Sequence, residues 1–131
     1  MTIIQPPGWP RPKGYSNGIL AEGKMLFVAG QIGWDQDEQF QTEDFVGQVR
    51  QTLTNTVAVL RAAEAGPEHI VRMTWYITSR QDYLDNLSEV GAVYREIIGK
   101  NFPVMAMVEV SALMEAQAKV EIETTAVIPD E

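Results

Sequence analysis

The chain has 131 residues, and its 10 basic and 18 acidic residues give a net charge of −8. This length predicts one domain, residues 1–131, with a hydrophobic core of its own. The negative charge argues against a nucleic-acid binder, because such a protein needs a basic patch for phosphates.

Cysteine is absent and histidine occurs once. The missing cysteines exclude disulfides, a thiol nucleophile and a thiolate metal site, and a single histidine argues against a His-rich metal site within one chain. No apolar run approaches the ~20 residues that span a bilayer, and the N-terminus lacks the charged start and apolar middle of a signal peptide. We therefore expect a soluble cytoplasmic protein.

The N-terminal segment 5–14, QPPGWPRPKG, is rich in proline and glycine. Such a composition predicts an extended, irregular chain. The segment is either a disordered tail or an arm that lies on a surface. Trp9 and Tyr15 favour the arm, because aromatic side chains add contact area when they pack.

Residues 24–31, KMLFVAGQ, are predicted to form a strand that ends at glycines. After a polar loop, Thr42 can cap a helix, with Glu43 and Asp44 in its first turn. Apolar residues then recur at spacings of four and three, as expected for one face of a helix; they are Phe45, Val49, Leu53, Val57 and Leu60. Gly66-Pro67 is expected to stop this helix.

Residues 70–78, IVRMTWYIT, alternate with period two and predict a second long strand. Ser79, with Asp82 three residues later, resembles a capping box. A second helical stripe follows and ends at Gly99; it contains Tyr83, Leu87, Val90, Tyr94 and Ile97. Two more strands are expected at 104–113 and 118–128, and a short strand near 19–21.

This order of elements predicts an α+β fold in which two helices cover one face of a sheet. The opposite face is expected to mix apolar and charged groups, namely Arg72, Thr74, Tyr76, Met105, Met107, Glu109, Lys119, Glu121 and Glu123. Two interpretations of that face stay open. It is a solvated surface, or it is a subunit interface in which several sheets meet around an axis.

Several segments, in this order, resemble the RidA/YjgF family over nearly the whole chain. They are GYSNG, FVAGQIGWD, RAAEAG, IVRMTWY, YREI, FPVMAMVEVSAL and VEIETTAV. The resemblance implies a chorismate-mutase-like fold and a homotrimer whose three sheets enclose a barrel, with ligand clefts between subunits. It also implies hydrolysis of reactive 2-imino or enamino acids to 2-keto acids and ammonia, without a metal or organic cofactor.

The resemblance also assigns site residues. Tyr15 matches the family's N-terminal tyrosine, Gly30 and Gln31 match the backbone that faces the ligand, and Glu121 matches the glutamate that positions the hydrolytic water. Met105 stands where the arginine of the family's FPARS motif clamps the substrate carboxylate, and methionine cannot do so. Gly33 replaces the proline after GQI, and Gly91 replaces an asparagine of the second helix.

Each candidate has a second interpretation. Met105 is an apolar filler, or it marks a divergent subgroup with another substrate. Glu121 positions water, or it pairs with a basic residue inside a trimer. Tyr15 belongs to the site or only packs, and Trp34 is a cleft wall or a lid on the core.

Arg72, on the polar sheet face, is the first candidate to replace the missing arginine, followed by Arg11 and Lys13 on the arm. Two functions remain open at this point. One is a cofactor-free deaminase of an enamine or imine other than the standard 2-imino acids. The other is a small-molecule binding protein that kept the trimeric cleft and lost the hydrolytic chemistry.

Overall fold

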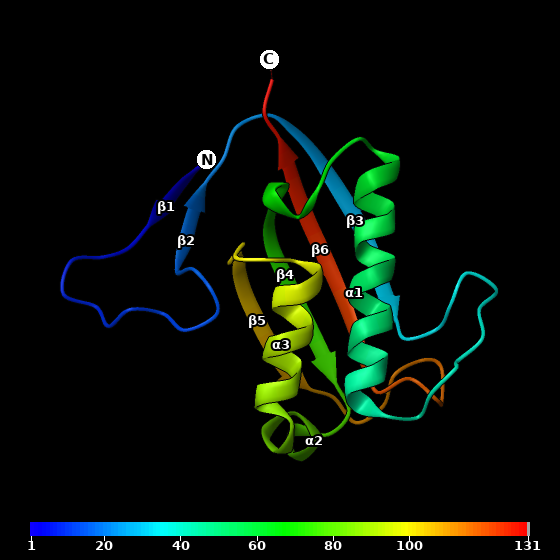
Figure 1. Ribbon diagram of the computed structural model, residues 1–131. Helices are drawn as coiled ribbons and strands as arrows, with labels where there is room; N and C mark the ends of the chain where they lie inside the picture. Colours follow the sequence, from blue (N-terminus) through cyan, green and yellow to red (C-terminus); the bar gives the residue numbers. More distant parts are fainter. Residues whose placement is uncertain (131) are drawn as a thin grey trace.

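Figure 1 shows the computed structural model, which describes residues 1–130. A four-stranded sheet carries helices on one face, which confirms the predicted α+β class, and a two-stranded hairpin projects to one side. The elements are β1 (Thr2–Ile4), β2 (Gly18–Leu20), β3 (Lys24–Ile32), α1 (Phe45–Ala62), a 3-10 turn (Pro67–His69), β4 (Ile70–Ile77), α2 (Arg80–Asp85), α3 (Leu87–Ile97), β5 (Val104–Glu109) and β6 (Val120–Ile128).

The strand order in the sheet is β3-β6-β4-β5. The strand β6 lies antiparallel between β3 and β4, and β5 runs parallel to β4 at the edge. A parallel neighbour requires a crossover connection, which α2 and α3 provide. The strands β3 and β5 therefore form the two opposite edges of the sheet.

The core lies between the helices and the sheet. The predicted stripe of α1 is confirmed, because Phe45, Val49, Leu53 and Leu60 are buried. The alternation of β4 is confirmed as well, because its buried side chains include Met73, Trp75 and Ile77. Within residues 1–130, none of the helices has the length and the apolar character that crossing a membrane requires.

The helix ends differ in part from the prediction. Asp44, not Thr42, caps α1, since its Oδ2 accepts a hydrogen bond from the Gly47 N–H at 2.8 Å. The second predicted helix is interrupted at Asn86 and forms α2 and α3. The Ser79 cap is confirmed, because its Oγ accepts from the Asp82 N–H at 3.1 Å.

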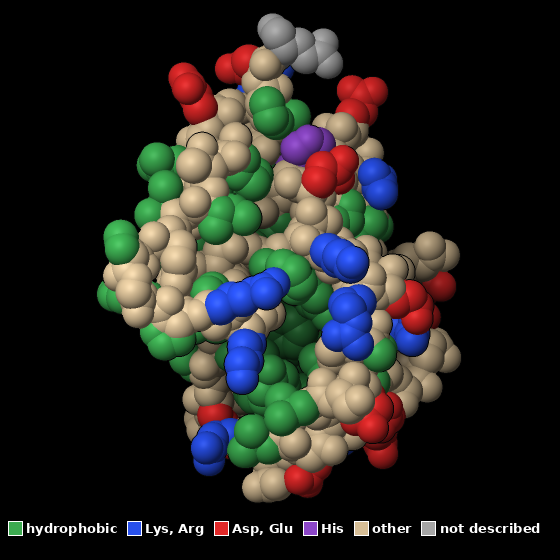
Figure 2. Space-filling view, turned by 60° about the vertical axis from the view of Figure 1, so that its left-hand side comes forward, with side chains coloured by type: hydrophobic (Ala, Val, Ile, Leu, Met, Phe, Trp, Pro, Cys, Tyr) green, Lys and Arg blue, Asp and Glu red, His purple; other side chains and the backbone are tan. Residues whose placement is uncertain are grey.

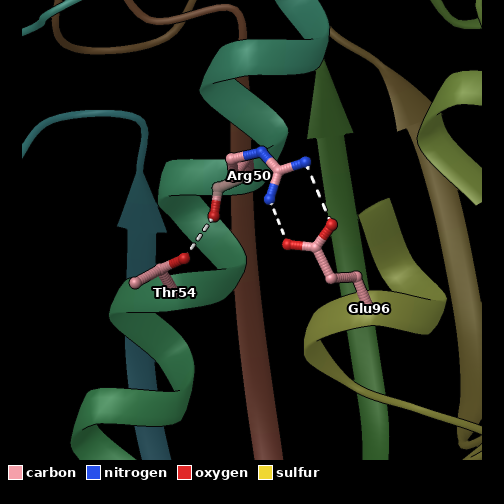
Figure 3. A network of polar contacts seen from close by, with 3 residues as sticks. All are labelled: Arg50, Thr54 and Glu96. Atoms are coloured by element: carbon pink, nitrogen blue, oxygen red, sulfur yellow. Dashed lines mark hydrogen bonds and ion pairs between the residues drawn. The ribbon is translucent and has the colours of Figure 1, made fainter. Parts of the chain in front are cut away.

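An ion pair between Arg50 and Glu96 links α1 and α3 on the outside of the helical layer (Figure 3). The Arg50 guanidinium donates two hydrogen bonds to the carboxylate, which lowers the pKa of Glu96. Both side chains are about half exposed, at 49% and 61%. Since exposed ion pairs contribute little to stability, this pair adds only a small contribution to the packing of α1 against α3.

The N-terminal segment is an arm held on the edge of the sheet, but not by its aromatic residues, because Trp9 and Tyr15 are exposed. The strands β1 and β2 pair with each other, and the chain between them returns to the domain at Ser16. Ser16 is buried, its N–H donates to the Pro103 carbonyl at 3.0 Å, and its Oγ donates to the Phe102 carbonyl at 2.5 Å. Ser16 thus extends the sheet beyond β5.

The predicted faces of β5 were wrong. Its register places Met105 opposite Met73 and Met107 opposite Trp75, and both methionines pack against the core under the helices. Val104, Ala106 and Val108 lie on the other face instead, opposite Arg72, Thr74 and Tyr76. The strand alternates valine or alanine with methionine, so both faces are apolar. A register shift of one residue exchanges the faces of a strand. Here the pairing with β4 determines which face of β5 lies under the helices.

Glu109 also belongs to the helix side. It pairs in register with Ile77, and its Oε1 accepts a hydrogen bond from the Arg80 N–H at 2.7 Å, at the start of α2. This glutamate therefore holds the β4–α2 turn to the end of β5. It is not part of a polar sheet face.

Gln48 is a fully buried polar side chain that joins three segments. Its amide nitrogen donates to the carbonyls of Thr42 and Gln117, at 3.2 and 2.9 Å, and its oxygen accepts from the Lys119 N–H at 2.8 Å. The start of α1 is thereby fixed to the loop that precedes β6. A Cβ atom on Gly33 would lie 2.7 Å from Gln48 Cβ, so glycine is required where β3 ends.

We predict that Gln48→Met lowers the free energy of unfolding by about 2–4 kcal/mol, because a similar volume is kept while three backbone groups lose their buried partner. Urea denaturation at one fixed protein concentration measures this. The control is Gln81→Met on the exposed side of α2, where the amide only bonds to Asp85; about 0.5 kcal/mol or less is expected there. Equal losses for the two variants would contradict the role of Gln48.

Candidate functional site

The face of the sheet without helices, called the open face below, carries the glutamate that the sequence singled out. Glu121 on β6 lies opposite Tyr76 of β4 in the antiparallel register. Its side chain lies directly over Gly30 of β3: a Cβ atom on Gly30 would be 2.2 Å from Glu121 Oε2. Only glycine leaves room for this carboxylate, so the predicted site residues Gly30 and Glu121 are neighbours. Gln31 follows, and its amide donates to the Ala29 carbonyl at 3.1 Å.

Polar groups surround Glu121 on the open face. The Tyr76 hydroxyl donates to Glu123 Oε1 at 2.7 Å. This hydrogen bond, together with desolvation and the two nearby carboxylates of Glu123 and Glu121, raises the pKa of Tyr76, and Arg72 partly opposes the shift. Tyr76 therefore remains a neutral hydrogen-bond donor across the physiological pH range. Arg72 lies on this face too, opposite Val104 and Thr125.

Met105 lines a cavity of about 280 Å³ between β5 and the helices, called the inner cavity below. The sheet contributes Trp75, Met105 and Met107. The other lining residues come from α2, α3, the segment before β5 and the N-terminal arm, namely Tyr83, Leu87, Val90, Gly91, Tyr94, Arg95, Phe102 and Gly14. Tyr94 is held by a hydrogen bond from its hydroxyl to the Asn101 carbonyl at 2.8 Å, and burial raises its pKa. The inner cavity is thus mainly apolar and aromatic.

An outer cavity of about 780 Å³ lies next to it, beneath the N-terminal arm. Tyr15 lines this cavity, and so do the basic residues Arg11, Lys13 and Lys100. Gly14 and Phe102 line both cavities, so the two adjoin. Figure 2 shows this side of the molecule as a hollow with a hydrophobic floor and with Lys and Arg side chains around its rim.

The predicted site residues therefore form two groups that do not meet within one chain. Gly30, Gln31 and Glu121 lie on β3 and β6, whereas Met105 lies on β5, at the other edge of the sheet and on its other face. A side chain at position 105 therefore cannot pair with Glu121 of the same chain. Arg72 is likewise separated from Met105 by the sheet, so it is not a substitute clamp within the same chain.

Trp34 belongs to neither cavity. Its ring packs against Phe40 with the centroids 6.0 Å apart, and its carbonyl accepts from the Asn55 amide at 2.7 Å. These contacts favour the interpretation of Trp34 as a lid on the core, in a loop that the Asn55 side chain ties to the middle of α1. Within residues 1–130, no three His, Asp or Glu side chains gather as they would around a metal ion.

Sequence reasoning missed Arg95, which lines the inner cavity from α3. The available signal was spacing. Arg95 lies four residues after Gly91, and residues four apart share one face of a helix. The position of Gly91, aligned with an asparagine of the family's second helix, therefore pointed to Arg95 as a neighbour of the same cleft.

Comparisons with known proteins cover nearly the whole chain. The sequence model of the family described as Endoribonuclease L-PSP matches residues 10–128. A RutC family protein of Synechocystis is 35% identical over 136 residues, which cover 98% of each chain. A 2-iminobutanoate/2-iminopropanoate deaminase of Capra hircus is 31% identical over 114 residues, which cover 86% of this chain and 79% of that protein.

Solved structures agree with these relatives. The Rid family protein YyfB from Yersinia pestis superposes with a TM-score of 0.83 at 27% identity, and the match covers 97% of this chain and 98% of that one. TdcF from E. coli, solved with bound serine, superposes with a TM-score of 0.68 at 30% identity and covers 98% and 99% of the two chains.

We predict that Met105→Arg folds and melts within a few degrees of the wild type, because the guanidinium can extend into the cavity. The matched control is Met73→Arg. Met73 is the register partner of Met105 on β4 but is fully buried, and an unpaired buried arginine costs several kcal/mol. Thermal melting of the two variants beside the wild type decides. If Met105→Arg is as unstable as Met73→Arg, then Met105 is ordinary packing.

Proposed function

Because this chain belongs to the RidA/YjgF family, we propose that it is a cytoplasmic, cofactor-free hydrolytic deaminase of enamines or imines. The observation that carries this proposal is the Glu121 carboxylate held against Gly30 on the open face. Two relatives are named as deaminases of 2-iminobutanoate and 2-iminopropanoate. Met105 replaces the motif's arginine, so the proposed substrate is not one of the standard small 2-imino acids.

The chemistry needs only water and a base. An enamine first tautomerises to its imine. Water then attacks the imine carbon while the Glu121 carboxylate accepts a proton from it, and this proton passes to the nitrogen to give a carbinolamine. Glu121 next takes the proton of the carbinolamine hydroxyl and passes it to the nitrogen, so that the C–N bond breaks, ammonia leaves and the carbon becomes a carbonyl. General-base assistance of this kind contributes about 10²–10⁴-fold.

The proposed site is shared between copies of the chain in a homotrimer. Large apolar side chains on the open face support this, because no helix covers them: Phe27 is 68% exposed, Met25 60% and Val108 44%. Exposed apolar patches are typical of interaction surfaces. If the open faces of three copies meet, Glu121 of one copy can approach the cavities at the β5 edge of the next, which one chain alone does not allow.

The second candidate, a binding protein without hydrolytic activity, is supported by Met105 itself. A methionine adds apolar contact to a ligand but holds no charge. This alternative predicts a ligand that binds in the cavities and is released unchanged.

We predict that light scattering after size exclusion gives three times the chain mass of 14.6 kDa. Phe27→Asp places a charge in the proposed interface and should shift the protein towards monomers. Met114→Asp is the control, since Met114 is 95% exposed in the loop between β5 and β6. A wild-type monomer at micromolar concentration would remove the interface and with it the shared site.

We predict that the protein accelerates ammonia release from imines generated in situ by an amino acid oxidase. Glu121→Gln should lower the rate by about 10²-fold or more, because the general base is lost. Glu123→Gln, two residues along the same face, serves as control and should keep most of the activity. Imines from alanine should react poorly, since the carboxylate clamp of the motif is absent. Binding without ammonia release from any imine would favour the second candidate.

A further inference from the structure

The mainly apolar lining of the inner cavity includes one charged side chain, which is also exposed to solvent. Of the residues around it, only Arg95 is charged, and the walls are formed by Trp75, Met105, Met107 and side chains of α2 and α3. The ion pair found among residues 1–130 joins Arg50 and Glu96, so Arg95 has no carboxylate partner there. A guanidinium that is always charged and lacks a partner beside an apolar pocket is suited to an anion.

Gly91 leaves open the space beside which the Arg95 guanidinium lies. A Cβ atom on Gly91 would lie 3.3 Å from Arg95 Nη1, closer than side chains usually approach. Gly91 and Arg95 lie one above the other on the cavity side of α3. The missing side chain at 91 therefore lets the guanidinium lie along the helix and close to the cavity that Met105 lines from the sheet.

The lining of the adjoining outer cavity is also positively charged. Arg11, Lys13 and Lys100 line it, against one carboxylate, that of Glu68. In a chain of net charge −8, this is a local excess of cations. Such a cluster raises the local concentration of anions and directs them to the cavity. Figure 2 shows the basic side chains around the hydrophobic hollow.

We propose that Arg95 binds the carboxylate of a ligand whose apolar side chain fills the inner cavity between α3 and β5. This deepens the proposed function, because it names the substrate class of the same site: imino or enamino acids with a branched aliphatic or aromatic side chain. A volume of about 280 Å³ is at the small end of ligand pockets, which matches a single amino-acid-sized acid.

A purely structural role for Arg95 makes a different prediction. Arg95 lies in the last turn of α3, where a cation also interacts favourably with the helix dipole. In that role its removal lowers stability slightly and leaves ligand affinity unchanged. Affinity for an anion is therefore the measurement that separates the two roles.

The experiment is isothermal titration with 4-methyl-2-oxopentanoate, a stable 2-keto acid with a branched apolar side chain. The wild type should bind it at least about tenfold more tightly than pyruvate, which lacks the side chain, and than its uncharged methyl ester. Arg95→Gln should weaken binding of the acid at least about tenfold and leave binding of the ester unchanged. Arg80→Gln, which removes a charge from α2 outside both cavities, should have no effect.

A charge-relocation variant makes the test independent of folding defects. In Arg95→Gln/Met105→Arg the cation moves from the helix wall of the inner cavity to its sheet wall, so affinity for the acid should return to within about tenfold of the wild type. The proposal is overturned if the wild type does not bind the acid, if the ester binds equally well, or if Arg95→Gln leaves affinity unchanged.

The measurements distinguish a failure of the proposed anion site from a failure of the proposed deaminase activity. If Arg95→Gln loses affinity for the acid but no imine is hydrolysed by the wild type, the anion site stands and the deaminase does not. If imines of apolar amino acids are hydrolysed equally fast by wild type and Arg95→Gln, the deaminase stands and Arg95 is not its carboxylate ligand.

Discussion

A four-stranded sheet whose chain supplies only one layer of helices can be covered on one face, and this constraint determines on which side each candidate residue of the sheet lies. The helices α1 and α3 bury one face. Polar groups that need water or a partner then collect on the other face, as Tyr76, Glu121 and Glu123 do. The side chains at the β5 edge remain under α3, next to a cavity. The proposed base and the proposed anion site are thereby held on opposite sides of one sheet.

Much of this arrangement could be predicted from the sequence, because strong periodicity leaves one choice of buried face. The stripe of α1 and the alternation of polar and apolar residues in β4 each correspond to one side that is apolar. In β5 the same reasoning fails. Its two faces are both apolar, and the register that distinguishes them comes from backbone hydrogen bonds to β4, which the residues of β5 do not encode by themselves.

The cavities were even harder to predict from the sequence than the faces of β5, because residues distant in the chain form them. The outer cavity exists only because the arm is held at Ser16 by the backbone around Pro103. Nothing in the segment QPPGWPRPKG specifies that contact. Arg95 illustrates a related difficulty, since an arginine in the last turn of a helix is common for electrostatic reasons alone. Only its position beside the inner cavity, which the structure shows, suggests a role in ligand binding.

Two departures from the family pattern can be understood as one change. The motif's arginine position is Met105, and an asparagine position is Gly91; taken separately, each removes a polar group from the cleft. In the structure both positions line the inner cavity, and the space left at Gly91 is where the Arg95 guanidinium lies. Restoring a side chain at 91 alone would displace that guanidinium, and restoring arginine at 105 alone would place two cations around one small cavity. In the proposed site the positive charge therefore lies on the helix wall instead of the sheet wall, and the sheet wall offers apolar contact surface to the side chain of the proposed ligand.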